Sequence, residues 1–322
     1  MTFGRDLKAE FSRLWHKKEP TNEIPLFRIL CEAILSQKNY ITAEIHGNRC
    51  QVEFKQRSHR FSSKKSPMCR CELGDLLIVA FSALRKEGRI VIIQNKVARK
   101  GNGKLRNTPR EVNASLVQYE LLYERPMFQY VGKKFKGSQD DILFSSPYNS
   151  VSLYGIFYEN GLGEVDMSSI TARELQLSNP PKHPITGTYP CAKLILPSSC
   201  SFQTKTSCFG DFAAAENLIN FGDLLEDLYI GRPITQRIKT EIIEKCMPAS
   251  KTIENTLSAR AEEVLKIFDS IDFPNPSNMS SNLSQSDSQP GHFIPMNICR
   301  SVIFINVDRL EQPLDVLQAQ NR

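Results

Sequence analysis

The stretch that decides the fold is CELGDLLIVAFS at 71–82, followed by GRIVIIQNKVA at 88–98. Each segment holds four consecutive apolar residues, at 76–79 and at 90–93, so both faces of an extended strand would be apolar. Strands with this pattern are covered on both sides, whereas half-exposed strands alternate apolar and polar residues. The polar connection ALRKEG joins the two segments. We therefore expect a hairpin at the centre of a sheet with helices on both faces.

The elements on either side of this pair mix helices and strands. Amphipathic spacing predicts helices in three places, 6–18, 22–37 and 110–123. Short alternating segments predict a strand hairpin within 40–61, turning at Gly47 and Asn48. Later in the chain the pattern predicts short strands between 150 and 210, helices at 211–228, 236–247 and 254–270, and a last strand at 299–308. The expected fold class is α/β, with a mixed central sheet flanked by helices and additional α+β elements toward the C-terminus.

Composition divides the chain into five segments. They are an N-terminal helix (1–20), an α/β core (21–135), an α+β extension (136–272), a linker (273–292), and a C-terminal strand and tail (293–322). The linker is rich in Pro, Ser and Asn and holds few charges, which is the composition of a flexible connection. The sequence does not decide whether the last strand joins the sheet from across this linker.

Charge is distributed unevenly along the chain. The net charge is +6 over 322 residues, yet the part from Asp211 onward holds 10 Lys and Arg against 16 Asp and Glu. The first 210 residues therefore carry a net charge of +12. A surface of that sign attracts polyanions by steering and by counterion release, although a basic face can also serve only solubility. The charge therefore favours a nucleic-acid partner without choosing between DNA and RNA.

Several classes of protein are disfavoured by the sequence. No apolar run approaches the 18 or so residues of a membrane span, and the start MTFGRDLKAEF lacks the apolar region of a signal peptide. The nine cysteines are odd in number, and the pair Cys69 and Cys71 lacks the spacing of a zinc site. We therefore expect a cytoplasmic protein with no membrane partner; a homodimer is compatible with these features.

Three polar side chains interrupt the apolar central strands. Gln94 and Lys96 are two apart and share one strand face, and Asp75 stands near the start of the preceding strand. Pairing residue 82 with 89 places 75–77 opposite 94–96, so an acid, an amide and an ammonium would converge. One interpretation is metal-assisted phosphodiester hydrolysis, in which Asp75 and Gln94 bind Mg²⁺ and Lys96 acts on the attacking water. The other is a buried salt bridge between Asp75 and Lys96 with Gln94 hydrogen-bonded beside it.

Asp75 followed by Gln94-Asn95-Lys96 on a hydrophobic strand resembles the PD-(D/E)xK restriction-endonuclease-like nucleases. The Gln-x-Lys ending is similar to the Mrr-type members, in which Gln replaces the usual Asp or Glu. The order of predicted elements over 26–125 also matches the αβββα core of that family. The resemblance implies a nuclease site at Asp75, Gln94 and Lys96 with Mg²⁺ or Mn²⁺ as cofactor, weakened because Gln94 carries no charge. A third acidic ligand would come from a set of four candidates: Glu32, Glu44, Glu53 and Glu72.

Two functions remain open at this point. The first is a metal-dependent nuclease, most simply acting on DNA, with a role in defence or repair. The second is a catalytically inactive module on the same fold that binds nucleic acid or a protein. In both cases Arg99, Lys100 and Lys104 are candidate phosphate contacts, because they follow Lys96 in the densest basic stretch of the chain. An interaction protein unrelated to nucleic acid is also compatible with the acidic C-terminal part.

Overall fold

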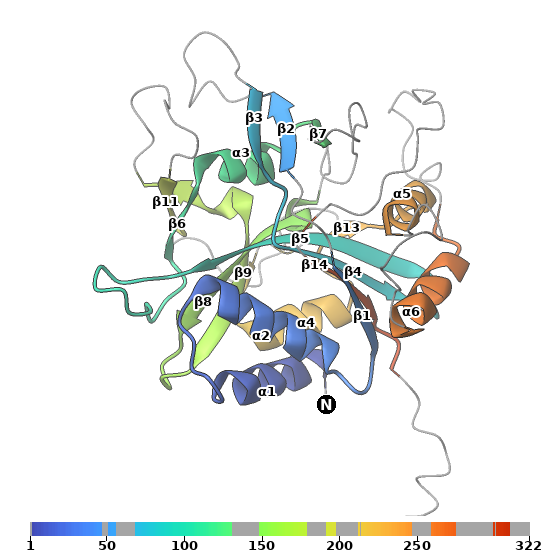
Figure 1. Ribbon diagram of the computed structural model, residues 1–322, viewed down its shortest axis with the longest axis horizontal. Coiled ribbons are helices and arrows are strands. Elements are labelled where there is room, and N and C mark those ends of the chain that lie inside the picture. The colour runs from blue at the N-terminus through green and yellow to red at the C-terminus, as the bar shows by residue number, and fades with distance from the viewer. Residues whose placement is uncertain are drawn as a thin grey trace, which may run out of the picture.

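A mixed eight-stranded sheet forms the centre of the computed structural model (Figure 1). The structure describes residues 2–46, 51–55, 68–130, 148–178, 191–197, 212, 214–246, 259–274, 299 and 301–309. The strand order is β1-β14-β4-β5-β8-β9-β12, and β13 pairs with β5 beside this path. These strands are β1 (Ile41–His46), β14 (Ser301–Asn306), β4 (Leu76–Ser82), β5 (Glu87–Val97), β8 (Ser152–Glu159), β9 (Val165–Thr171), β12 (Ala214–Ala215) and β13 (Arg232–Pro233). The expectation of an α/β protein with a mixed sheet flanked by helices is confirmed.

The central hairpin of β4 and β5 forms as predicted, but its register differs by two residues. Ser82 pairs with Glu87 rather than with residue 89, and the last pair of the ladder is Leu76 with Ile93. One step further, Asp75 comes opposite Gln94, and its backbone N–H donates to the Ile93 carbonyl at 3.0 Å. The turn is tighter than expected because it is held from far along the chain. The Asp308 carboxylate accepts the Ser82 hydroxyl and the backbone N–H groups of residues 83 and 84.

The last strand, β14, completes the sheet between β1 and β4. It runs antiparallel to β1 and parallel to β4, and all six of its residues are buried. Most of the predicted linker, from residue 275 on, lies outside the described residues. The predicted hairpin within 40–61 is wrong. β1 belongs to the main sheet, whereas β2 (Gln51–Lys55) lies in a separate sheet between β3 (Met68–Glu72) and β7 (Phe128–Tyr130).

Helices cover both faces of the main sheet, as the double-sided apolar strands require. One apolar cluster includes Ile78, Val91 and Ile93 and is covered by α1 (Phe3–Trp15), α2 (Glu23–Leu35) and α4 (Leu218–Glu226). The opposite cluster includes Val79 and Ile92 and is covered by α3 (Leu116–Glu124), α5 (Gln236–Cys246) and α6 (Ala259–Ser270). In Figure 1, α1, α2 and α4 gather on one side of the sheet. Among the described residues, no helix is long and apolar enough to cross a membrane.

The first half of the helix predicted at 110–123 is a strand, and only the second half is helical. Residues 111–115 form β6 (Glu111–Ser115), which pairs with β11 (Cys191–Ile195), and β10 (Gln176–Leu177) completes this third sheet. Helix α3 then begins after Ser115, whose hydroxyl accepts the backbone N–H of Gln118 at the helix N-terminus. Two short 3₁₀ turns, η1 (Asn149–Val151) and η2 (Ala172–Glu174), lie next to β8 and β9. Because β8 follows α3 and runs parallel to β5, the segment from β5 to β8 is a strand-helix-strand crossover.

Candidate functional site

Asp75 and Gln94 meet at the end of the β4–β5 hairpin. Asp75 Oδ2 accepts the Gln94 side-chain Nε2 at 2.6 Å and the Asn95 backbone N–H at 2.9 Å. Asp75 and Gln94 are each 3 % exposed. The sequence prediction that these two side chains converge is confirmed, and they form part of a buried hydrogen-bond network.

Gln118 of α3 extends this network from the other side. Its side-chain Nε2 donates to Gln94 Oε1 and to the backbone carbonyl oxygen of Glu72 at 3.2 Å. Gln118 was not among the site residues predicted from the sequence. The available signal was its helical spacing, since Leu121 and Leu122 lie three and four residues further on the buried face of α3. A Gln on such a face needs a buried hydrogen-bond partner.

Lys96 lies beside the network but forms its salt bridge with Glu23, the first residue of α2, rather than with Asp75. The Lys96 Nζ to Glu23 Oε1 distance is 3.0 Å, and the two side chains are 13 % and 38 % exposed. The two-residue difference in register explains this partner, because Gln94 rather than Lys96 stands opposite Asp75. Glu23 was not among the predicted acids, and a single Glu at a helix start gives no signal in the sequence beyond its favourable place near the helix dipole.

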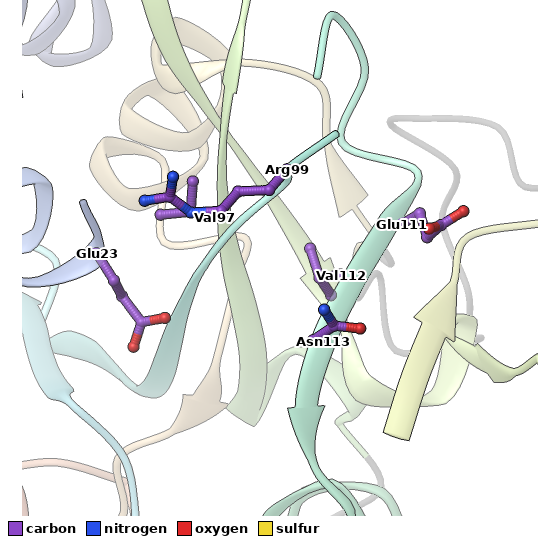
Figure 2. A pocket seen from close by; sticks show the side chains of 6 residues that line it. All are labelled: Glu23, Val97, Arg99, Glu111, Val112 and Asn113. Carbon is purple, nitrogen blue, oxygen red and sulfur yellow. The ribbon is translucent and has the colours of Figure 1, made fainter. Parts of the chain in front are cut away.

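A pocket of about 200 Å³ opens next to this salt bridge (Figure 2). Its walls come from α2, the end of β5 and β6, and are formed by Glu23, Val97, Arg99, Glu111, Val112 and Asn113. Figure 2 shows Glu23 reaching the pocket from one side, opposite Val112 and Asn113, while Glu111 turns away from it. Glu111 Oε1 lies 2.7 Å from both Arg106 and Lys193. Both carboxylates of the pocket therefore have cationic partners.

The three predicted phosphate contacts lie on a small hairpin that continues from β5. Arg99 faces Leu105 across an isolated bridge, and its guanidinium donates to the Gly103 and Thr21 carbonyls and to Asn22. Arg99 thus fastens the hairpin to the start of α2. Lys100 and Lys104 are exposed, and the Lys100 ammonium donates to Asn107 Oδ1 at 2.8 Å. These two ammonium groups can be reached from solvent.

The four candidate third acids are spread over α2, β1, β2 and β3. Glu32 is exposed on α2, Glu44 lies on the edge strand β1, and Glu53 forms a salt bridge with Arg70 at 2.8 Å. Glu72 contributes its backbone carbonyl to the network through Gln118. In the described part of the chain, no three His, Cys, Asp or Glu side chains gather where they could hold a metal ion.

The network as arranged does not fit a divalent cation. Mg²⁺ takes oxygen ligands, and one or two carboxylates together with waters and a phosphate are enough for it. Here, however, Gln94 turns its NH₂ group toward Asp75 and its carbonyl oxygen toward Gln118. A cation beside Asp75 would therefore meet N–H hydrogens instead of an amide oxygen.

Two buried groups next to the network are disfavoured as bases or nucleophiles near neutral pH. Tyr154 pairs with Gln94 across the β5–β8 ladder, and burial raises the pKa of its phenol well above the ordinary value. Burial likewise raises the pKa of the Cys71 thiol. Both groups therefore favour the protonated form, and Asp75, Lys96 and Glu23 are the candidate reactive groups at this place.

Comparison of the chain with protein-family models, with curated proteins and with solved structures found no match.

Proposed function

We propose that this chain is a nucleic-acid-binding protein built on a restriction-endonuclease-like core. The observation that carries the proposal is the state of the nuclease-like residues: Asp75 and Gln94 are buried and hydrogen-bonded to each other, and Lys96 is paired with Glu23. In this arrangement the polar atoms of Gln94 and the ammonium of Lys96 are directed to protein partners. Helix α2, the strands β1, β4 and β5 of the main sheet, and helix α3 follow one another as the αβββα core would require, with β2, β3 and β6 inserted, and this order supports the proposal. The polar network then serves the stability of the fold.

The support for a nucleic-acid partner comes from charge. The first 210 residues have a net charge of +12, and Lys100 and Lys104 are exposed on the hairpin beside the pocket. Exposed ammonium groups on a hairpin can contact successive phosphates without reading the sequence. We take DNA as the ligand, because the resemblance to the restriction-endonuclease-like nucleases implies it.

Gel-shift or anisotropy titration of a labelled DNA duplex at several salt concentrations tests this binding. We expect the double variant Lys100→Glu/Lys104→Glu to bind at least about tenfold more weakly at low salt. The slope of log affinity against log salt should also fall by about 1.8, because two phosphate contacts are lost. The matched control is Lys17→Glu/Lys18→Glu, which makes the same change in net charge at exposed lysines after α1. Equal effects of the two double variants would refute the hairpin as the contact.

The second candidate function is a metal-dependent nuclease. It is favoured by one observation, namely that Asp75, Gln94 and Lys96 lie at one end of a hairpin that continues through α3 to the parallel strand β8. Supercoiled plasmid incubated with Mg²⁺, Mn²⁺ or EDTA, beside a Lys96→Ala variant, separates the two candidates. Salt-sensitive binding without cleavage supports the binding protein. Metal-dependent nicking that disappears in Lys96→Ala would overturn it in favour of the nuclease.

A further inference from the structure

We propose that Gln118 closes a latent divalent-metal site by holding the carbonyl oxygen of Gln94 away from Asp75. This inference concerns the metal chemistry of the network and does not depend on whether the chain binds nucleic acid. It makes Gln118 a positioning residue, because it would act through Gln94 and not on the metal itself.

Both ends of the network accept hydrogen bonds. At one end stands the backbone carbonyl oxygen of Glu72, which cannot donate. At the other end, Asp75 Oδ2 already accepts the backbone N–H of Asn95 at 2.9 Å. Two amides, those of Gln118 and Gln94, lie between these acceptors. Their orientation is therefore fixed by their neighbours.

The direction of each hydrogen bond between the two acceptors follows from the Glu72 end. The Glu72 carbonyl requires the NH₂ group of Gln118, and the same NH₂ group donates its other hydrogen to Gln94 Oε1. Gln94 then has only its NH₂ group to offer to Asp75, at 2.6 Å. Turning Gln94 alone would set two NH₂ groups against each other. Turning both amides would set the Gln118 carbonyl oxygen against the Glu72 carbonyl oxygen.

The orientation of the Gln94 amide decides which atoms a cation beside Asp75 would meet. If the Gln94 amide were reversed, its carbonyl oxygen would stand next to Asp75 Oδ2, at the place now taken by the nitrogen. Two oxygens in that position repel each other unless a cation bridges them, and a carboxylate with an amide oxygen is a ligand pair that suits Mg²⁺ or Mn²⁺. Asp75 and Gln94 therefore hold the ligands of a metal site, and Gln118 holds one of them in the wrong direction.

Gln118→Glu tests the inference, because a carboxylate of nearly the same shape accepts a hydrogen bond where the Gln118 amide donates one. The Gln94 NH₂ group should then turn to the introduced carboxylate, and its carbonyl oxygen should turn to Asp75. Second-layer partners of metal ligands change metal affinity by about 10–100-fold. We expect at least about a tenfold gain in Mn²⁺ affinity over the wild type, measured by isothermal titration calorimetry and by the loss of the free Mn²⁺ electron paramagnetic resonance signal.

The added negative charge alone could attract a cation, so a second variant is required. Gln118→Glu/Gln94→Leu keeps the new carboxylate and removes the amide oxygen, and we expect it to lose the gain. An equal gain in this double variant would overturn the inference, as would a Gln118→Glu variant that folds and binds Mn²⁺ no better than the wild type.

Gln118→Leu, which removes the donor without adding charge, provides an independent reading and should show a smaller gain of the same sign. Thermal unfolding of each variant reports whether it has folded. The wild type is measured in every case, and tight Mn²⁺ binding by the wild type would refute the inference even if no variant folds.

Discussion

Replacement of Lys96 by alanine should cost little stability, because the partner of Lys96 is near the surface. The Lys96 ammonium lies 3.0 Å from Glu23, and the two side chains are 13 % and 38 % exposed, so solvent reaches the pair from the Glu23 side. Exposed pairs contribute about 0–1 kcal/mol, since water screens the charges and ordering long side chains opposes the gain. Some packing of the lysine methylene groups is lost as well. We expect the free energy of unfolding to fall by about 1 kcal/mol, which for a chain of 322 residues shifts Tm by roughly 1.5 °C.

The size of this loss in stability distinguishes the observed Lys96–Glu23 pair from a buried Lys96–Asp75 pair. Had Lys96 paired with buried Asp75, its removal would leave an uncompensated buried charge and cost about 3–5 kcal/mol. Urea unfolding followed by the fluorescence of Trp15, the one tryptophan of the chain and a buried residue of α1, measures the difference. The control is Glu23→Gln, which should cost about as little, with a coupling energy between the two positions below about 1 kcal/mol. A loss of 3 kcal/mol or more in Lys96→Ala would refute the structure of this pair.

Three further predictions concern the buried network, the last strand β14 and Glu226 at the end of α4. Asp75→Ala should lower the free energy of unfolding, measured in urea, by about 2–6 kcal/mol, because the buried donors of Gln94 and Asn95 lose their acceptor at about 1–3 kcal/mol each. Asp75→Asn keeps one side-chain oxygen and should lower it less. A chain ending at residue 298 should not fold, because the four apolar residues of β14 at 302–305 are fully buried and contribute roughly 6–12 kcal/mol to stability in all. Circular dichroism measures the loss of structure, and a chain ending at residue 309 should fold. Burial raises the pKa of Glu226, but hydrogen bonds from Tyr40, the backbone N–H of residue 3 and Arg309 outweigh it and hold the pKa below its ordinary 4.5. The stability that these contacts contribute at neutral pH should therefore be lost as the pH falls below 4.5. Glu226→Gln should weaken this acid dependence in melts at several pH values, and an unchanged profile would argue against these contacts.

The central hairpin could be predicted because its signal is local. Two runs of four apolar residues need cover on both faces, whatever the rest of the chain does. Its register could not be predicted from the same residues. The turn is held by Asp308, more than 200 positions along the chain, and nothing in the ALRKEG segment indicates that contact.

The positions of β1, β2 and β14 were beyond local inference for a related reason. An alternating segment predicts a strand but does not say which strand it pairs with. The hairpin signal at Gly47 and Asn48 favoured pairing with the next strand in the sequence. The chain instead places β14 beside β1, where its apolar residues are buried on both faces. The same apolar content that identified β14 as a strand explains why it occupies the interior of the sheet and not an edge.

In the candidate site, residue types predicted which side chains meet but not how the Gln94 amide is oriented. Asp75 and Gln94 were expected to converge, and they do, yet the same contact serves either a metal site or a closed network. The difference between the two is the direction of one amide. That direction is set by the Glu72 carbonyl and by Gln118, neither of which belongs to the Asp75–Gln94–Lys96 pattern. A motif therefore names the atoms that could bind a cation, while the acceptors behind the motif determine whether those atoms face it.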